Sequence, residues 1–215
     1  MPLKIPVLVR GINNLSDARY CAGMGADGLI FTLDPMLPGA VTPALVRELA
    51  GWVSGVELIG EFTPATPYHA INELVQTCGL NRVLLLYDEP YAAAFFEPAA
   101  LQVPVIVEMS PEIMFDFDAY EYEAMTSGLA GHFPAGFELA IEAESFLSNR
   151  VLYQERTRLP SRPALWLSGE FTPHNVLETA GLGPAGLILS GGDEIKPGLR
   201  DFTELEAIFE ALEAD

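Results

Sequence analysis

Six carboxylates, each near the C-terminal end of an apolar run, are the residues of this sequence best placed to do chemistry. They are Glu61, Asp88, Glu108, Glu142, Glu144 and Glu170. Carboxylates in such places can bind a divalent cation or a cationic amine, neutralise a buried arginine, or simply face solvent. Because a shift of one residue turns a strand side chain to the other face, the sequence leaves open which of them point inward.

Arg10 ends the first apolar run and carries a charge that persists at neutral pH. A guanidinium keeps its proton, so Arg10 cannot act as a general base. In a partly buried setting it needs carboxylate partners or an anionic ligand. Full pairing with protein carboxylates would make it a structural ion pair. An Arg10 that points into an open pocket would instead favour a metabolite bearing a carboxylate or a phosphate.

The elements that must position these residues are short apolar runs alternating with helical patterns. The runs predict eight buried parallel strands, because each is rich in Val, Ile or Leu and bounded by Gly, Pro or polar turns. They are Lys4–Arg10, Gly28–Leu33, Val56–Phe62, Arg82–Tyr87, Val103–Met109, Phe137–Ala143, Ala164–Ser168 and Gly186–Ser190. We therefore predict an α/β fold, a single (β/α)₈ barrel over residues 1–215, rather than an open doubly wound sheet. Functional residues of such barrels gather at the C-terminal ends of the strands.

Several helices carry start and stop signals in the sequence. Ser16 precedes the first helix, and Thr42, Thr66 and Thr172 each stand before a proline, as an N-cap residue followed by the first helical residue would. Gly79 ends the third helical pattern.

Three features fall outside this regular alternation. Residues 115–123 alternate aromatic and acidic side chains, which favours an extended edge segment over the expected fifth helix, and Arg150 to Arg162 is locally basic. The five residues Gly60–Pro64 recur as Gly169–Pro173, at the ends of the third and seventh strands. That repeat is consistent with half-barrel symmetry. Trp52 and Trp166 are expected to pack between the helices and the barrel.

Composition restricts the classes of partner. The 215 residues carry 11 Lys and Arg against 30 Asp and Glu, a net charge of −19. Such a field disfavours nucleic acid, anionic membrane surfaces and phosphorylated ligands that lack a local site. The two cysteines are far apart and predict buried free thiols in a cytoplasmic protein, and the scattered histidines predict no metal. We expect no cofactor, and a small-molecule metabolite as the partner.

Motifs along most of the chain resemble the phosphoribosylanthranilate isomerase family. Residues 7–19 match its opening strand, turn and Asn-Leu-x-Asp-Ala helix start. Further matches follow in the family's order and are carried by Gly25–Gly28, Val41–Pro43, Leu167–Gly169, Pro173–Val176, Ser190–Gly191 and Pro197–Asp201. The resemblance implies a TIM barrel and the Amadori isomerisation of tryptophan biosynthesis.

The resemblance also implies site residues, and several of them differ here. The family's general base, a cysteine, falls on Arg10, and its general acid, an aspartate, falls on Glu142. Its anthranilate-binding arginine falls on Gly39. The family's phosphate-binding loops match Gly169, Ser190, Gly191 and Gly192, although Glu170 replaces a glycine there and would oppose phosphate. Because the family sets its catalytic pair on the first and sixth strands, Glu142 is the expected first partner of Arg10, with Glu61 and Glu108 next.

Three functional hypotheses remain open. The first is a diverged barrel that binds a small metabolite, phosphorylated or carboxylated, at its C-terminal face without the standard isomerisation. The second is a non-catalytic binding or regulatory barrel. The third is an active isomerase that uses Glu142 as its general acid.

Overall fold

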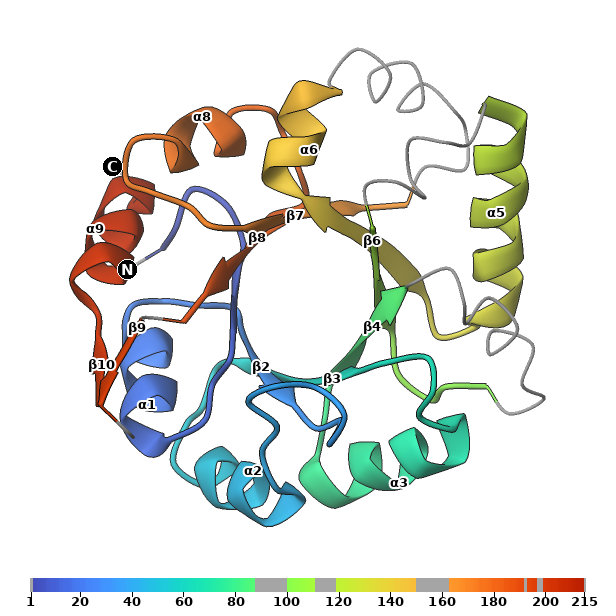
Figure 1. Cartoon of the computed structure of the whole chain (residues 1–215), viewed down its shortest axis with the longest axis horizontal. Coiled ribbons are helices and arrows are strands. Elements are labelled where there is room, and N and C mark those ends of the chain that lie inside the picture. The colour runs from blue at the N-terminus through green and yellow to red at the C-terminus, as the bar shows by residue number, and fades with distance from the viewer. Residues whose placement is uncertain are drawn as a thin grey trace.

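A closed barrel of eight parallel strands forms the centre of the molecule (Figure 1). The computed structural model describes residues 2–87, 100–110, 119–149, 163–191, 193–196 and 199–214. Each strand pairs with the next, and β8 pairs with β1 so that Arg10 lies opposite Ser190. The predicted (β/α)₈ barrel is confirmed. Its strands are β1 (Val7–Arg10), β2 (Gly28–Thr32), β3 (Glu57–Phe62), β4 (Arg82–Tyr87), β5 (Val105–Met109), β6 (Phe137–Glu142), β7 (Leu165–Gly169) and β8 (Gly186–Ser190).

Helices surround the ring of strands (Figure 1). They are α1 (Leu15–Gly23), α2 (Pro43–Ala50), α3 (Tyr68–Cys78), α5 (Ala119–His132), α6 (Ala143–Ser148), α8 (Val176–Ala180) and α9 (Thr203–Leu212). A two-stranded antiparallel hairpin, β9 (Asp193–Lys196) and β10 (Leu199–Asp201), joins the barrel to α9. No helix among the described residues is both long and apolar enough to cross a membrane.

The helix-start predictions are only partly right. Thr42 caps α2 by accepting a hydrogen bond from the Leu45 N–H, and Gly79 ends α3 in the left-handed conformation, as predicted. The α1 cap is Asn14 rather than Ser16. Thr66 does not cap α3, because its hydroxyl donates to Asp34 instead.

The interior of the barrel is filled by one apolar ring. The strands contribute one residue each: Leu8, Ile30, Ile59, Leu84, Ile106, Ala140, Trp166 and Ile188. A second, larger core lies between the strands and the helices. Because successive strand side chains face opposite sides, this arrangement fixes which residues point inward along each strand. The prediction for Trp166 is therefore wrong, since it lies inside the barrel.

Gly186 makes room for the Trp166 ring. A Cβ at residue 186 would lie 2.1 Å from Cζ3 of Trp166, so a side chain there would displace the indole. Trp52 was also expected to be packed, but 63% of its surface is exposed.

Below the apolar ring, one arginine closes the N-terminal end of the barrel. Arg82 Nε lies 2.8 Å from Glu57 and Nη1 lies 2.7 Å from Glu138, and we call these three residues the floor triad. The Trp166 indole N–H donates to the same Glu138 carboxylate at 2.7 Å. The side chains of the floor triad and the Trp166 ring thus fill this end of the barrel together.

The acidic and aromatic segment is helical where the structure describes it. Helix α5 begins at Ala119, so residues 119–123 do not form the predicted extended edge, and residues 115–118 lie outside the described residues. The basic residues from Arg150 to Arg162 also lie outside them. Cys21 and Cys78 are free and buried, as predicted.

Candidate functional site

The C-terminal mouth of the barrel is lined by the residues that follow the apolar ring by two positions on every strand. This mouth ring consists of Arg10, Thr32, Glu61, Leu86, Glu108, Glu142, Ser168 and Ser190. Members of it line a cavity of about 600 Å³ and a neighbouring one of about 360 Å³, and Arg10, Leu86 and Ser190 border both. The predicted carboxylates of β3, β5 and β6 are therefore brought together.

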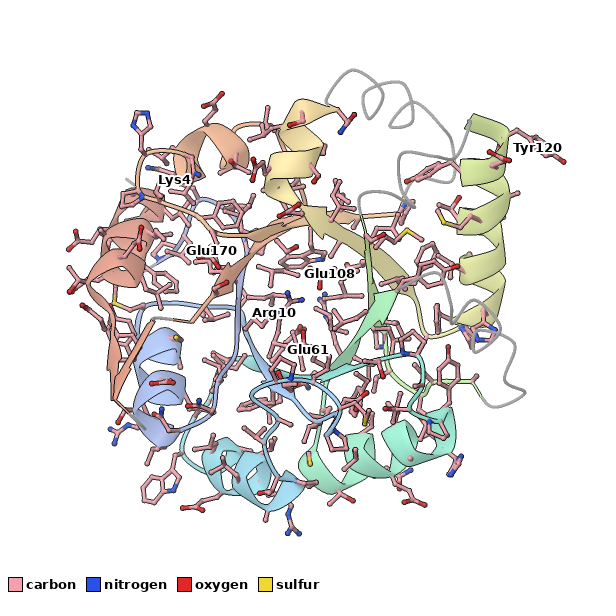
Figure 2. The ribbon with its side chains drawn as sticks, in the orientation of Figure 1. Lys4, Arg10, Glu61, Glu108, Tyr120 and Glu170 are labelled. Carbon is pink, nitrogen blue, oxygen red and sulfur yellow. The ribbon has the colours of Figure 1, made fainter. Side chains whose placement is uncertain are left out.

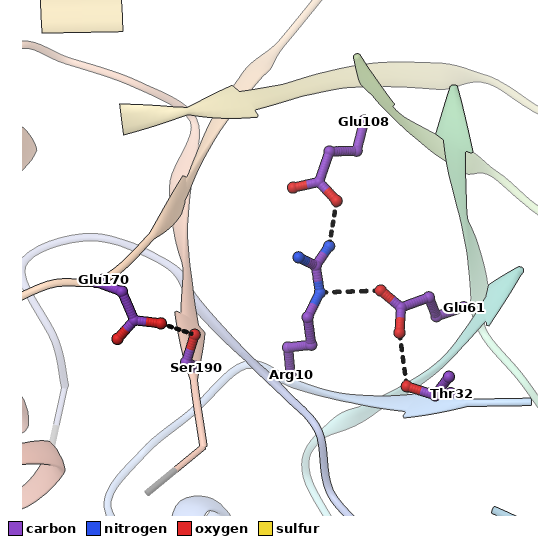
Figure 3. A network of polar contacts seen from close by, with 6 residues as sticks. All are labelled: Arg10, Thr32, Glu61, Glu108, Glu170 and Ser190. Atoms are coloured by element: carbon purple, nitrogen blue, oxygen red, sulfur yellow. Dashed lines mark hydrogen bonds and ion pairs between the residues drawn. The ribbon is translucent and has the colours of Figure 1, made fainter. Parts of the chain in front are cut away.

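Arg10 lies between two of these carboxylates (Figure 3). Its Nε is 3.0 Å from Glu61 Oε1, and its Nη2 donates to Glu108 Oε2. The Thr32 hydroxyl donates to the other Glu61 oxygen at 2.6 Å. The side chains of Glu61 and Glu108 are only 6% and 14% exposed, and that of Arg10 is 29% exposed. We call Arg10, Glu61 and Glu108 the mouth triad; Figure 2 shows them pointing toward the centre of the barrel.

The mouth triad keeps Arg10 charged. Burial alone lowers the Arg10 pKa, but the negative charges of Glu108 and Glu61 outweigh burial and raise the pKa above its ordinary value. A permanently protonated guanidinium stabilises anions and cannot accept a proton. Because two carboxylates pair with Arg10, it forms the structural ion pair that such pairing predicts and is not an unpaired site for an anionic metabolite.

Glu142 does not pair with Arg10, so the expected order of partners is wrong. It stands at the end of β6, is exposed, and accepts a hydrogen bond of 2.7 Å from the Ser145 hydroxyl. Its carboxylate nevertheless lines the 600 Å³ cavity together with Arg10 and Glu108. A carboxyl group in that place can still exchange protons with a bound ligand.

The loops after β7 and β8 use part of their hydrogen-bonding capacity internally. The Ser190 hydroxyl donates to Glu170 Oε1 at 3.1 Å, and the Gly191 N–H donates to the Arg10 carbonyl at 2.9 Å. Gly169 has φ +143°, which side-chain-bearing residues rarely adopt, so β7 requires a glycine at its end. Gly192 lies outside the described residues.

Asp34 ties together the loops that follow β2 and β3. Only 1% of its surface is exposed, and its carboxylate accepts hydrogen bonds from the N–H and hydroxyl of Thr63, the Thr66 hydroxyl and the Met36 N–H. Burial alone would raise the Asp34 pKa, but these donors stabilise the carboxylate and lower it. This rim of the mouth is held by a buried negative charge.

Sequence reasoning missed Thr32 and Ser168 as members of the mouth ring. A signal for them exists in the pairing of the strands, because Thr32 lies opposite Glu61 and Ser168 lies opposite Glu142. Within the described residues no group of His, Cys, Asp or Glu side chains is arranged to hold a metal ion.

Curated relatives that span almost the whole chain are all of one kind. An N-(5'-phosphoribosyl)anthranilate isomerase of Trichormus variabilis is 30% identical over 212 residues, which cover 96% of this chain and 97% of the relative. One from Chlorobium phaeovibrioides is 27% identical over 218 residues, 94% of each chain. No protein-family model matches the sequence.

Solved structures agree on the fold. A phosphoribosyl anthranilate isomerase in complex with reduced 1-(o-carboxyphenylamino)-1-deoxyribulose 5-phosphate superposes with a TM-score of 0.69 at 20% identity, covering 97% of this chain and 98% of that one. The isomerase of Thermus thermophilus gives a TM-score of 0.67 at 22% identity, with the same coverage.

Proposed function

Because the chain belongs to the phosphoribosylanthranilate isomerase family, we propose that it is a diverged member that binds a small metabolite at its mouth. We propose in addition that it does not isomerise phosphoribosylanthranilate by the family's base-catalysed route. The metabolite occupies the 600 Å³ cavity, at the end of the barrel where TIM-barrel sites form. A protein of this fold was solved in complex with reduced 1-(o-carboxyphenylamino)-1-deoxyribulose 5-phosphate, which supports a small-molecule ligand.

One observation carries the proposal, namely the pairing of Arg10 with Glu61 and Glu108. The resemblance puts the family's general base at residue 10, where this chain has a guanidinium that is held charged. Proton transfer by a placed base is worth about 10²–10⁴ in rate, and the anthranilate clamp expected at Gly39 is also missing. Turnover of phosphoribosylanthranilate should therefore be negligible.

Phosphate is a poor fit to the loops after β7 and β8. Gly169, Ser190 and Gly191 were expected to hold phosphate, yet the Ser190 hydroxyl and the Gly191 N–H already have acceptors inside the protein. Glu170 adds a negative charge beside them. We therefore expect any binding of phosphate there to be weak.

The direct test is an assay of the purified chain with phosphoribosylanthranilate, together with complementation of a tryptophan auxotroph lacking the isomerase. We expect no turnover above background and no growth. A thermal-shift screen of small metabolites should in turn find compounds that stabilise the wild type and lose their effect when Glu108 or Glu142 is replaced by Gln. Growth of the auxotroph would overturn the proposal.

A second candidate, an active isomerase with Glu142 as general acid, is favoured by one observation: the Glu142 carboxylate lines the cavity at the end of β6. It predicts measurable turnover in the wild type and its loss in Glu142→Gln. A non-catalytic binding barrel differs from both in that its ligand is released unchanged. Product analysis after incubation with a stabilising compound separates these cases.

A further inference from the structure

Glu170 stands where two cavities adjoin. The mouth cavity of about 600 Å³ and an outer cavity of about 670 Å³ share Glu170, Leu189 and Ser190 in their walls. The outer cavity continues past the end of β8 to Asp201, the last residue of β10, and to Glu204 on the first turn of α9. A ligand that extends from the mouth into the outer cavity must pass the Glu170 carboxylate.

Among the described residues, the walls of these cavities carry far more negative than positive charge. Arg10 is the only basic residue that lines them within the described chain, and it is already paired with Glu61 and Glu108. No ion pair among the described residues neutralises Glu142 or Glu170. Asp201 accepts hydrogen bonds from Thr203, which lower its pKa and keep it ionised.

A second carboxylate at the mouth shows what a glutamate there can bind. Glu61 and Glu170 occupy the same place in the five-residue repeat, but Glu61 is buried within β3, whereas Glu170 is exposed and directly follows β7, the strand opposite. Each accepts a hydrogen bond from a hydroxyl of a neighbouring strand, Thr32 for Glu61 and Ser190 for Glu170 (Figure 3). Glu61 in addition binds a guanidinium, that of Arg10, at 3.0 Å.

We infer that Glu170 selects the charge of the ligand, and that the ligand is an elongated molecule carrying a protonated amine or guanidinium. Its cationic group sits at Glu170 as the Arg10 guanidinium sits at Glu61, and the rest of the molecule extends into the outer cavity. This assignment rests on the proposed binding function and names its ligand class. It also accounts for the poor fit to phosphate, because the same carboxylate repels a dianion.

The test compares two probes of opposite charge on three proteins. The probes are 1,4-diaminobutane and ribose 5-phosphate, and the proteins are the wild type, Glu170→Gln and the control Glu178→Gln, which removes an exposed charge on α8. Calorimetric titration at low salt should show that Glu170→Gln weakens diamine binding about threefold to tenfold. It should strengthen ribose 5-phosphate binding by a similar factor, whereas Glu178→Gln should change neither.

The possible failures are distinguishable. Equal effects of the two substitutions would assign the selectivity to net charge and overturn the role of Glu170. Tighter binding of ribose 5-phosphate than of the diamine by the wild type would overturn the cationic ligand class while leaving a binding function in place. If none of the three proteins bound either probe, the proposed binding function and this inference would both fail. Unchanged melting temperatures of the ligand-free variants confirm that folding is not the cause.

Discussion

The two ends of the barrel each hold one arginine between two glutamates, but in different surroundings. At the floor, Arg82 lies under the Trp166 ring, 5.9 Å from its centroid, and its partners Glu57 and Glu138 are 40% and 28% exposed. At the mouth, Arg10 has the more buried partners, yet its end of the barrel opens into a cavity. The same kind of ion pair is therefore packed against the Trp166 ring at the floor and borders a cavity at the mouth.

This difference matches the proposed division between a structural floor and a ligand-binding mouth. At the floor the polar groups bond to one another, since Glu138 accepts hydrogen bonds from both the Arg82 guanidinium and the Trp166 N–H. The mouth adds Glu142 and Glu170, whose charges no described cation neutralises. In TIM barrels the N-terminal end serves stability and the C-terminal end carries the site.

Removal of the Trp166 ring should have the largest effect on stability. Trp166→Ala empties the barrel interior beside Gly186 and should lower the free energy of unfolding by about 3–5 kcal/mol. Urea denaturation measures this change. Trp166→Phe is the control, because it keeps an aromatic ring in the barrel interior while it removes the hydrogen bond to Glu138. A cost below about 1 kcal/mol for Trp166→Ala would show that packing of the Trp166 ring does not stabilise the barrel as proposed.

Removal of the Arg10 charge should come next. Arg10→Met leaves Glu61 and Glu108 buried without a cation, and breaking such a pair costs about 3–5 kcal/mol when it is fully buried. Because the Arg10 side chain is 29% exposed, we expect about 2–3 kcal/mol in urea denaturation. Arg10→Cys should be destabilised likewise and should not gain isomerase activity. Substantial turnover by Arg10→Cys would show that only the base had been lost.

The Asp34 carboxylate should make the mouth sensitive to acid. Its pKa is lowered in the folded protein, so its charge stabilises the fold above the pKa of an unfolded aspartate, about 4. That contribution is lost as the pH falls through the lower, folded value. Asp34→Asn should cost about 1–2 kcal/mol at pH 7 and less near pH 3.

Urea denaturation of Asp34→Asn at both pH values checks this, with Glu178→Gln as a control for loss of an exposed charge. A cost for Asp34→Asn that is the same at pH 3 and pH 7 would contradict the role of its ionised form.

Removal of the Arg82 charge should have the smallest effect. Arg82→Met is the same substitution as Arg10→Met at the other end of the barrel, but the glutamates it leaves behind reach solvent. We expect about 1 kcal/mol or less. If Arg82→Met cost as much as Arg10→Met, the two ends would be energetically alike, and the contrast between them would fail.

The barrel could be predicted from the sequence because its strands are apolar runs with clearly marked ends. The runs Arg82–Tyr87 and Gly186–Ser190 match the observed strands residue for residue. Helix starts were less predictable, since a hydroxyl such as that of Thr66 can serve a distant carboxylate instead of the adjacent helix. The indole of Trp166 could not be placed inside or outside the barrel without the register of β7, and Gly186 provides the space it needs.

The site was predictable in its location and only partly in its contacts. Arg10, Glu61, Glu108, Glu142 and Glu170 all lie at the mouth, as strand ends of a parallel barrel must. Arg10 pairs with carboxylates of β3 and β5, whose side chains reach it across the mouth. It does not pair with the carboxylate of the sixth strand, as the family resemblance implied. The Glu142 carboxylate instead accepts a hydrogen bond from Ser145, which lies nearby on the first turn of α6. The order of the strands does not predict such a local partner.

The unlike environments of the two tryptophans give this protein a built-in optical readout. Trp52 is in contact with solvent, whereas Trp166 is sealed inside the barrel one ring below the mouth cavity. In Trp52→Phe the remaining indole is a single fluorophore whose emission reports on the barrel interior. Occupation of the mouth can then be followed as a spectral change without a label, and collisional quenchers that dim Trp52 in the parent protein will not reach Trp166 while the barrel is closed.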